Sequence, residues 1–474
     1  MPSASNKPRI SFNAVFELTE TYFQLARELS DSAESFFICP DHMTRGRLLS
    51  YGVAPSRILD LSITRAGMLK LPPLDAREAE RAAETEKFGP GFPSLVMMSG
   101  RFYRQKDSAQ LYNYLARCAL KIEDFMRSNG IEWAFAEPTT APEILSYSVA
   151  AKLGVKAVNI SVIRHPASRC AIFTGIDESA PVPLAPLEGD LSREELRSWL
   201  EAFRRRGEKT ITYDSQSRHR SPLSLMRSAL SRTGLIFREL SGKNQLNYTN
   251  FPVQSEIFSR RYRSFRRRFD NTFIGDSFSG DPRPYVVFFL HVQPERTIDV
   301  MSPHNSNQLE VIRQLRMVLP SSIKLAVKEH PSAYGIQPPA FYRGLEGIPD
   351  VSLLKAGDNT RKLLESAAFA ATITGTVGME AALLDIPAVV LSDVFFSRMP
   401  NVFRLKNPSD LSAALPSVLK HRKGVSDERL VDYLYFLVNH SHPCDWDTLG
   451  GWKNESTIAQ LGRLVKRALQ GEGR

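Results

Sequence analysis

Short apolar strands that alternate with helices recur in two separate parts of this 474-residue chain, and this alternation constrains its fold most strongly. Parallel strands joined by helices are buried on both faces of a sheet, so they appear as short continuous apolar runs. The first series has strands expected at residues 10–16, 35–39, 133–136 and 156–160, with a helix at 141–153. The second has strands expected at residues 285–290, 323–327, 369–373 and 388–391, with helices at 307–318, 360–366 and 378–384. The sequence therefore predicts an α/β fold with two doubly wound, Rossmann-like domains.

The alternation is weakest between residues 181 and 281, where proline-rich and arginine-rich segments such as 260–268 replace it. One glycine and two prolines in the segment 280–284 interrupt regular structure just before the second series begins. We therefore predict an N-terminal domain at residues 1–280 that includes a basic helical excursion. A C-terminal domain follows at 281–445, and a closing helix within 446–474 packs back.

The formal net charge of +10 favours an anionic partner, which a nucleic acid, a nucleotide or an anionic membrane surface would satisfy equally well. No nucleic-acid motif accompanies the arginine-rich segment, so we expect no nucleic-acid partner. The four cysteines form no CxxC pair, which favours a reducing compartment. No apolar run is long enough for a signal peptide or a membrane span. We expect a cytoplasmic protein, with peripheral contact at the anionic inner membrane as one option.

A histidine motif follows the expected strand at 323–327, at the strand end where ligands bind in open α/β sheets. Its residues are Lys328, Glu329, His330 and Pro331. An imidazole in this position can offset the charge of a phosphate, and the proline fixes the backbone as the chain turns away. An isolated His-Pro pair is more often structural, and the chain has two others. Only His330 lies at such a strand end.

A glycine-containing loop follows the expected strand at 369–373 and opens a helix. Its residues are Thr374, Gly375, Thr376, Val377 and Gly378, followed by Glu380. Backbone amides at a helix start bind phosphate, and the two threonine hydroxyls can add donors. Glu380 would contact a ribose hydroxyl or merely complement the helix dipole. Tight packing of strand on helix explains the glycines equally well, but His330 on the same sheet favours phosphate binding.

Three further positions follow apolar strands. His291, Gln293 and Glu295 begin where the strand at 285–290 ends, and a ligand contact or a polar turn explains them about equally well. In the N-terminal half, Glu137 ends the strand at 133–136 and is the best candidate for an acid, base or nucleophile, with helix capping as the competing role. Arg164 follows the next strand and can bind a carboxylate in a bidentate manner, although surface placement is nearly as plausible.

These motifs resemble those of the bacterial capsule and surface polysaccharide biosynthesis proteins, a family that includes retaining Kdo transferases. The resemblance covers residues 285–393 and rests on the segments 291–297, 307–312, 327–331 and 375–382. It implies a GT-B architecture, in which two Rossmann-like domains face a cleft and the C-terminal one holds the donor nucleotide. It also implies a CMP-activated sugar as donor, no metal and no further cofactor. This chain departs from the family's usual pattern at Arg296, where relatives have a small residue.

Carried onto this sequence, the resemblance implies that His330 contacts the donor phosphate, that Thr374 and Thr376 support it, and that Glu380 lies near the ribose or base. We expect a glycosyltransferase that moves Kdo or a related acidic sugar from a CMP donor to a glycan or glycolipid of the bacterial surface, in capsule or lipopolysaccharide. Glu137 would then be the catalytic carboxylate. A GT-B transferase that uses a UDP or GDP sugar or CDP-glycerol is the alternative, and a non-catalytic nucleotide-binding scaffold is the second.

Overall fold

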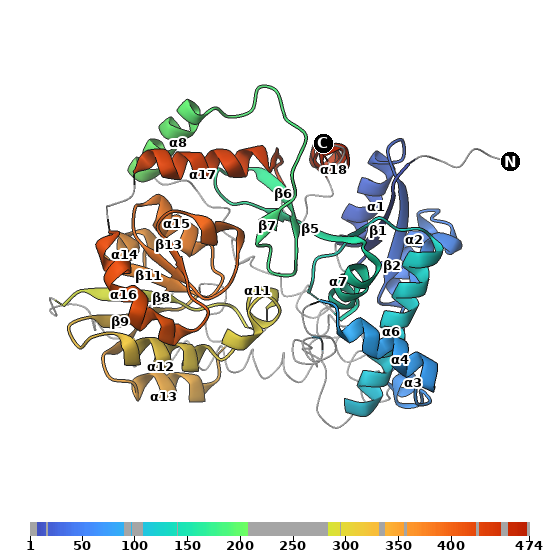
Figure 1. The fold of residues 1–474 in the computed structure, drawn as a ribbon, viewed down its shortest axis with the longest axis horizontal. Coiled ribbons are helices and arrows are strands. Elements are labelled where there is room, and N and C mark those ends of the chain that lie inside the picture. Colours follow the sequence, from blue (N-terminus) through green and yellow to red (C-terminus); the bar gives the residue numbers. More distant parts are fainter. Residues whose placement is uncertain are drawn as a thin grey trace, which may run out of the picture.

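The computed structural model describes residues 7–15, 18–89, 96, 108–139, 141–206, 283–293, 295–330, 337–354, 358–422, 426–446 and 454–471. These residues form two β-sheets that lie side by side along the long axis of the molecule, each covered by helices (Figure 1). We call the part built on the first sheet the N-terminal lobe and the part built on the second sheet the C-terminal lobe. The arginine-rich segment 260–268 lies outside the described residues.

The first sheet has eight strands, in the order β14-β6-β5-β4-β1-β2-β3, with β7 also paired to β6. Strands β1 to β5 are parallel, whereas β6 pairs antiparallel with β5, β7 and β14. The strands are β1 (Arg9–Asn13), β2 (Glu34–Cys39), β3 (Ile58–Asp60), β4 (Trp133–Phe135), β5 (Lys156–Val162), β6 (Arg169–Thr174), β7 (Ala180–Pro181) and β14 (His442–Pro443). The parallel part therefore has the strand order 3-2-1-4-5 of a Rossmann sheet.

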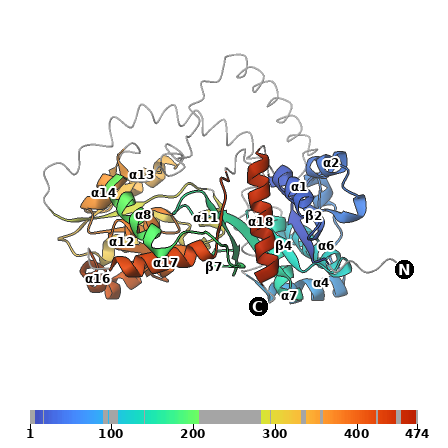
Figure 2. The same cartoon turned by 90° about the horizontal axis from the view of Figure 1, so that it is seen from above.

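Helices cover both faces of this sheet because side chains alternate along each strand. Phe12 and Phe135 point into a core shared with α1 and α18, whereas Ile38 and Ala134 point into one shared with α6 and α7. The helices are α1 (Leu18–Glu28), α2 (His42–Ser50), α3 (Arg65–Leu69), α4 (Ala76–Glu86), α6 (Ser108–Ser128), α7 (Ala141–Leu153) and α18 (Glu455–Gly471). Figure 2 shows α18, the last described helix, beside α1.

The second sheet has six parallel strands in the order β10-β9-β8-β11-β12-β13, which is the Rossmann order 3-2-1-4-5-6. Its strands are β8 (Tyr285–Phe289), β9 (Lys324–Lys328), β10 (Val351–Leu354), β11 (Phe369–Thr372), β12 (Ala388–Val390) and β13 (Val402–Arg404). Its helices are α11 (Arg296–Asp299), α12 (Gln308–Val318), α13 (Pro339–Glu346), α14 (Thr360–Ser366), α15 (Val377–Leu383), α16 (Leu411–Lys420) and α17 (Asp427–Asn439). Asn359 caps α14 by accepting from the amide of Lys362 at 3.0 Å.

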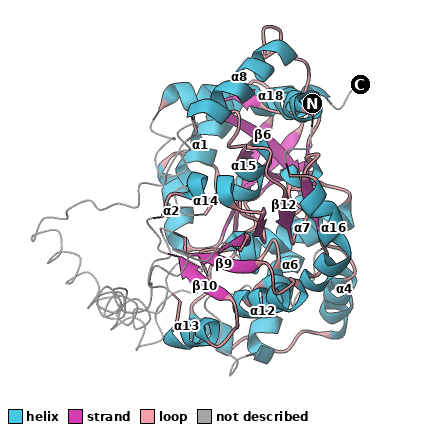
Figure 3. Ribbon diagram, turned by 90° about the vertical axis from the view of Figure 1, so that its left-hand side faces the viewer, coloured by secondary structure: helices cyan, strands magenta, loops and turns pink. Residues whose placement is uncertain are grey.

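Two segments cross between the lobes (Figure 1), and Figure 3 shows the molecule from the side of the C-terminal lobe. Helix α8 (Arg193–Arg206) follows the first sheet but packs on α15 and α17 of the C-terminal lobe, where Leu196 and Leu200 are fully buried. Helix α17 then leads back through β14 to the first sheet and to α18. Phe173 of β6 also packs against Phe395 of the C-terminal lobe, with ring centroids 5.4 Å apart. The lobes are therefore interleaved.

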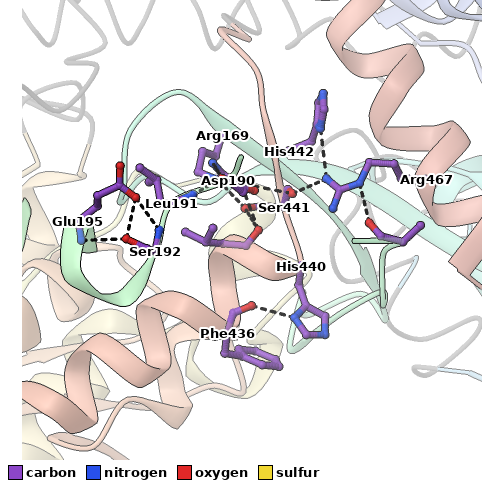
Figure 4. Close-up of polar contacts among 12 residues, drawn as sticks. Arg169, Asp190, Leu191, Ser192, Glu195, Phe436, His440, Ser441, His442 and Arg467 are labelled. Atoms are coloured by element: carbon purple, nitrogen blue, oxygen red, sulfur yellow. Dashed lines mark hydrogen bonds and ion pairs between the residues drawn. The ribbon is translucent and has the colours of Figure 1, made fainter. Parts of the chain in front are cut away.

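A buried polar cluster holds the second crossing (Figure 4). Arg169, only 4% exposed, makes a bidentate ion pair with Asp190 at 2.8 and 2.6 Å and donates from Nε to Ser441 Oγ at 2.8 Å. Arg467 of α18 donates to the Ser441 carbonyl at 3.0 Å and to His442 Nδ1 at 3.2 Å. Ser441, where the chain returns to the first sheet, is thus held by two guanidinium groups.

The predicted fold class is confirmed, because both lobes are Rossmann-like α/β layers. The carboxyl-terminal edges of the two sheets also approach each other, since Arg296 after β8 lies 3.9 Å from Glu137 after β4. The domain boundaries at residues 280 and 445 stay a prediction, and the structure adds the crossings of α8 and β14. Within the described residues, no helix is long and apolar enough to cross a membrane.

Candidate functional site

The candidate residues of the C-terminal lobe lie at the point where the strand order reverses. In a sheet of order 3-2-1-4-5-6 this switch point lies between the first and fourth strands, here β8 and β11, and ligands bind just beyond it. Strand register aligns Phe289 with Lys328 on one side, and Phe288 with Ala371 on the other. The segments that begin at His291, Glu329 and Thr374 therefore emerge at one edge, with His291 in the middle.

Backbone and side-chain contacts fix the orientation of His291. Its amide donates to Gln308 Oε1 at 2.8 Å, and Gln308 Nε2 donates back to the His291 carbonyl at 3.2 Å. The amide of Thr374 donates to His291 Nε2 at 3.1 Å. Because Nε2 accepts, the proton of the neutral ring must be on Nδ1.

His291 is neutral and carries an unused donor. Burial, and to a lesser extent the neighbouring His330, lowers its pKa to about 3. The residue is 6% exposed, and its Nδ1 has no hydrogen-bond partner among the described residues. A buried polar group without a partner is costly, so the site is suited to an acceptor that supplies one, such as a phosphate oxygen.

The loop after β11 is more constrained than the sequence indicated. The Thr374 hydroxyl donates to the Thr297 carbonyl at 2.8 Å, so its proton is used within the protein and is not directed at a ligand. The Gly375 amide donates to Thr372 Oγ1 at 3.1 Å, and a Cβ on Gly375 would lie 2.6 Å from that oxygen. A Cβ on Gly378 would lie 3.0 Å from Phe396. Packing therefore accounts for both glycines.

Three donors remain at this loop. Thr376 is the N-cap of α15 and makes no side-chain capping bond. No described residue accepts from the amides of Thr376 or Val377. The Thr376 hydroxyl and these two amides are the parts of the predicted phosphate loop that the protein leaves available.

The histidine motif after β9 divides into a buried and an exposed part. Lys328 and Glu329 are 2% and 1% exposed, so both side chains lie inside the lobe. Lys328 donates to the Glu329 carbonyl at 3.2 Å, and Glu329 accepts from the Tyr342 hydroxyl. His330 is exposed, and partial desolvation together with the Lys328 charge lowers its pKa. Pro331 lies outside the described residues.

Gln293 and Glu295 shape the turn into α11. Gln293 Nε2 donates to Asp299 Oδ1 at 2.8 Å and Gln293 Oε1 accepts from Gln308 at 3.2 Å. The Glu295 amide donates to Asp299 Oδ2 at 2.9 Å, and Glu295 is the N-cap of α11. These contacts favour the polar-turn alternative for Gln293, and they place Arg296 at the start of the helix.

Arg296 reaches from this turn into the N-terminal lobe. Its Nη2 donates to Glu178 Oε1 at 2.7 Å, and its Nη1 lies 3.9 Å from Glu137 Oε1. Burial lowers the pKa of Arg296, but the carboxylates of Glu178 and Glu137 outweigh this effect and raise it overall. Burial raises the pKa of Glu137, Arg296 opposes that shift, and Glu178 and Glu295 add to it. The Glu137 side chain is still 37% exposed, so a substrate can reach it.

Glu137 also lies at a switch point, the one between β1 and β4 in the first sheet. The residue is followed by α7, whose Tyr147 hydroxyl donates to the Ala136 carbonyl at 3.0 Å. Asn13, at the end of β1, donates to Ser146 Oγ at 2.8 Å. The ends of β1 and β4 are thereby tied to α7.

Arg164 and Glu380 approach each other from opposite lobes. Burial raises the pKa of Glu380, and the charges of His165 and Arg164 lower it, which places these two N-terminal residues beside α15. Arg164 has a positive φ of 65°, which directs the chain sharply after β5. A cation from the N-terminal lobe therefore borders the loop expected to bind the nucleotide.

The structure brings most predicted site residues to the junction of the lobes and adds some that the sequence analysis did not select. The additions are Gln308, which orients His291; Arg296 and Glu178, which form the ion pair; and Asn159, which donates to Glu178. Gln308 lies in a segment that carries the family resemblance, so a signal for it existed. Glu178 and Asn159 lie in no motif and are recognisable only in three dimensions.

The described residues contain no cluster of three or more His, Cys, Asp or Glu side chains that would hold a metal ion. The contacts at the junction are made instead by imidazoles, backbone amides, carboxylates and one guanidinium.

Comparison with known structures found chains that cover much of this one at low similarity. MnaA of S. aureus in complex with UDP matches with 10% identity and a TM-score of 0.26, covering 92% of this chain and 95% of that one. The UDP-GlcNAc 2-epimerase of Methanocaldococcus jannaschii has 13% identity and a TM-score of 0.26, covering 91% and 99%. The β-Kdo 2,7-transferase KpsC of Thermosulfurimonas dismutans has 12% identity and a TM-score of 0.30, covering 69% and 82%. At these scores, none of the three bears on the function of the chain.

No curated protein sequence matches the chain significantly. A family model does: residues 247–400 match the model described as capsule polysaccharide biosynthesis protein. This stretch contains His291, Arg296, His330 and the loop at 374–378, which are the residues gathered at the switch point of the second sheet. The resemblance inferred from the motifs is therefore confirmed: residues 247–400 of this chain match the capsule polysaccharide biosynthesis family.

Proposed function

We propose that this protein is a glycosyltransferase that moves an acidic sugar, Kdo or a close relative, from a CMP-activated donor to a glycan or glycolipid of the bacterial surface. The observation that carries the proposal is the approach of two switch points. The nucleotide-side residues His291, His330 and Thr376 follow strands of one sheet, and Glu137 follows a strand of the other. Arg296 bridges the two groups. A donor held by one lobe would present its sugar to the carboxylate of the other.

His291 and Thr376 would give the phosphate neutral donors, and His330 would lie beside it. His291 offers its unused Nδ1 proton, His330 lies exposed at the adjacent strand end, and Thr376 offers a hydroxyl at the start of α15. Oriented donors in a site of low dielectric stabilise the charge that develops as the nucleotide leaves. Glu380 would face the ribose, and Arg164 beside it would receive the carboxylate of the acidic sugar. A CMP donor and a metal-independent reaction are implied by the family resemblance.

The electrostatics around Glu137 suit glycosyl transfer. Two other carboxylates, those of Glu178 and Glu295, act on Glu137 together with the single guanidinium of Arg296, so the local charge is negative when all are ionised. Transition states of glycosyl transfer have oxocarbenium character and carry positive charge on the sugar. A carboxylate-rich site stabilises that charge. Glu137 is the more exposed of the two carboxylates that pair with Arg296, which favours it as the group that acts on the anomeric carbon or on the acceptor hydroxyl.

The test is transfer from CMP-Kdo to lipid or oligosaccharide acceptors by the purified protein, followed by CMP release and by mass spectrometry of the product. We expect CMP release with wild type, a loss of at least a hundredfold with Glu137→Gln, and a loss of at least tenfold with His330→Ala. Turnover of a UDP or GDP sugar or of CDP-glycerol, with none of any CMP-linked acidic sugar, would refute the proposal. Intact glycan synthesis in cells that carry either variant, together with loss of synthesis when the protein is deleted, would instead indicate a scaffold.

The proposal includes a cytoplasmic location with peripheral contact at the anionic inner membrane, where a glycolipid acceptor would be presented. The formal charge of +10 supports such contact. Sedimentation with vesicles that contain anionic lipid, at low and at physiological salt, tests it against vesicles of neutral lipid.

A further inference from the structure

We propose that Arg296 is a positioning residue, which reaches from the nucleotide-binding lobe into the other lobe and orients the Glu137 carboxylate for reaction. This inference rests on the proposed function, because it assigns a partner to the carboxylate that the function requires.

The guanidinium is placed by its own lobe. Arg296 begins α11, whose N-cap Glu295 is fixed through its amide by Asp299 at 2.9 Å. The next residue, Thr297, accepts through its carbonyl from the Thr374 hydroxyl at 2.8 Å. The loop expected to bind phosphate and the arginine that contacts Glu137 are therefore joined by one hydrogen bond and one peptide unit.

In the N-terminal lobe, Glu178 holds the guanidinium of Arg296. It is 7% exposed, accepts from Asn159 Nδ2 and pairs with Arg296 Nη2 at 2.7 Å. Its backbone has a positive φ of 57°, so the loop before β7 is shaped to present this side chain. A carboxylate that accepts hydrogen bonds from two buried donors has a structural role. Glu178 therefore holds Arg296, and the looser contact of 3.9 Å leaves Glu137 able to react.

Arg296 is the cation that counters the negative surroundings of Glu137. The groups that interact with Glu137 are Glu295 and Arg296 at α11, Glu178 before β7, Tyr22 on α1 and Tyr147 on α7. Glu143 on α7 interacts in turn with both tyrosines. Burial and the two nearby carboxylates raise the pKa of Glu137, and Arg296 lowers it. Loss of the guanidinium should therefore raise the pKa of Glu137 further, so that the carboxylate protonates at a higher pH. An arginine that did not face Glu137 would not move this titration.

The experiment compares wild type with Arg296→Gln and Arg296→Lys, and measures the pH profile of kcat with CMP-Kdo together with the Kd for CMP. We expect Arg296→Gln to lower kcat at least tenfold, to move the acid limb of the profile to higher pH, and to leave the Kd for CMP within twofold. Arg296→Lys should restore part of both effects. The variant Glu137→Gln combined with Arg296→Gln should lose no more than Glu137→Gln alone, because residues that act as a unit are not additive.

Arg204→Gln is the matched control. Arg204 is another partly buried arginine with an ion pair, to Asp427 at 2.8 Å, but it lies on α8 outside the site. We expect it to leave the acid limb in place. An unmoved acid limb in Arg296→Gln, additive losses in the double variant, or a large rise in the Kd for CMP would each overturn the positioning role.

The inference can fail separately from the proposed function. If wild type transfers no sugar from any donor, the proposed function fails, but the titration of Glu137 remains measurable. Infrared difference spectra between wild type and Glu137→Gln isolate its carboxyl band. A titration that moves to higher pH in Arg296→Gln supports the inference in that case, and an unchanged titration refutes it.

Discussion

The buried imidazole of His291 makes the C-terminal lobe sensitive to acid. Burial lowers its pKa to about 3, whereas a histidine in an unfolded chain titrates near 6.5. Between these values the unfolded chain binds a proton that the folded lobe does not, so acid favours unfolding. The stability that depends on the neutral ring is fully present above pH 6.5 and is lost progressively as the pH falls towards 3.

The size of this loss of stability follows from the difference between the two pKa values. A pH of 5.0 is about 1.5 units below the pKa of a histidine in the unfolded chain, and each unit corresponds to about 1.36 kcal/mol. His291 therefore removes about 2 kcal/mol from the free energy of unfolding of its lobe between pH 7.5 and pH 5.0, which is roughly a thirtyfold change in the equilibrium constant. The value applies because the residue is 6% exposed and its ring nitrogen already accepts from the Thr374 amide.

Native-state hydrogen exchange measures this loss lobe by lobe, because protection of amides in β8 and β11 reports the opening of the second sheet. We expect protection there, corrected for intrinsic exchange, to fall about thirtyfold more in wild type than in His291→Gln between the two pH values. Glutamine cannot titrate, and its amide oxygen can still accept from Thr374. His304→Gln is the control, because that histidine is exposed. Equal loss of protection in wild type and in His291→Gln would show that His291 titrates normally and would refute the reasoning.

Three further predictions concern other contacts of the structure. Bound phosphate should raise the lowered pKa of His330, so wild type should bind CMP more tightly as the pH falls from 8 to 6. Calorimetry should show a flatter pH dependence in His330→Ala, and a flat profile in wild type would contradict the prediction. Gly375→Ala places a Cβ 2.6 Å from Thr372 Oγ1, so urea unfolding should show a free energy of unfolding lower by about 1–3 kcal/mol. Adding Thr372→Ala should recover part of this loss, and full stability of the single variant would exclude the clash. Asp190→Asn leaves the 4% exposed Arg169 without its carboxylate partner, so thermal or urea unfolding should show a free energy of unfolding lower by about 3–5 kcal/mol. A decrease below about 1 kcal/mol would mean that the ion pair is solvated.

The amino-acid sequence by itself predicted the strands of the second series more closely than those of the first, and it did not predict β3, β10 or β13. Helices α7 (Ala141–Leu153) and α14 (Thr360–Ser366) have the predicted bounds, and each strand predicted in the second series lies within one residue of its position in the structure at either end. These elements carry strong local signals: continuous apolar runs, an Asn cap at α14, and Gly154 with a φ of 70° after α7. The long helix α6 (Ser108–Ser128) was not anticipated, because no motif marks it.

Strand ends were a good guide to the candidate site for the same reason. Residues that follow apolar strands of a parallel sheet meet at its carboxyl edge, so His291, His330 and Thr374 were selected correctly as neighbours. Their individual contacts were not predictable. The Thr374 hydroxyl is bound to the Thr297 carbonyl and Lys328 is buried, because packing of one segment on another decides which donor remains available.

Only the tertiary structure decided how the lobes are joined. The pairing of Arg296 with Glu178 and its approach to Glu137 combine residues from two sheets, and the crossings of α8 and β14 set how those sheets lie together. Local propensity and hydrophobic period describe a chain over a few turns or strands, whereas an ion pair between lobes depends on how two separate cores dock. The sequence therefore determined the elements and the sheet edges, and the docking of the two cores determined which carboxylate of the N-terminal lobe faces the C-terminal lobe.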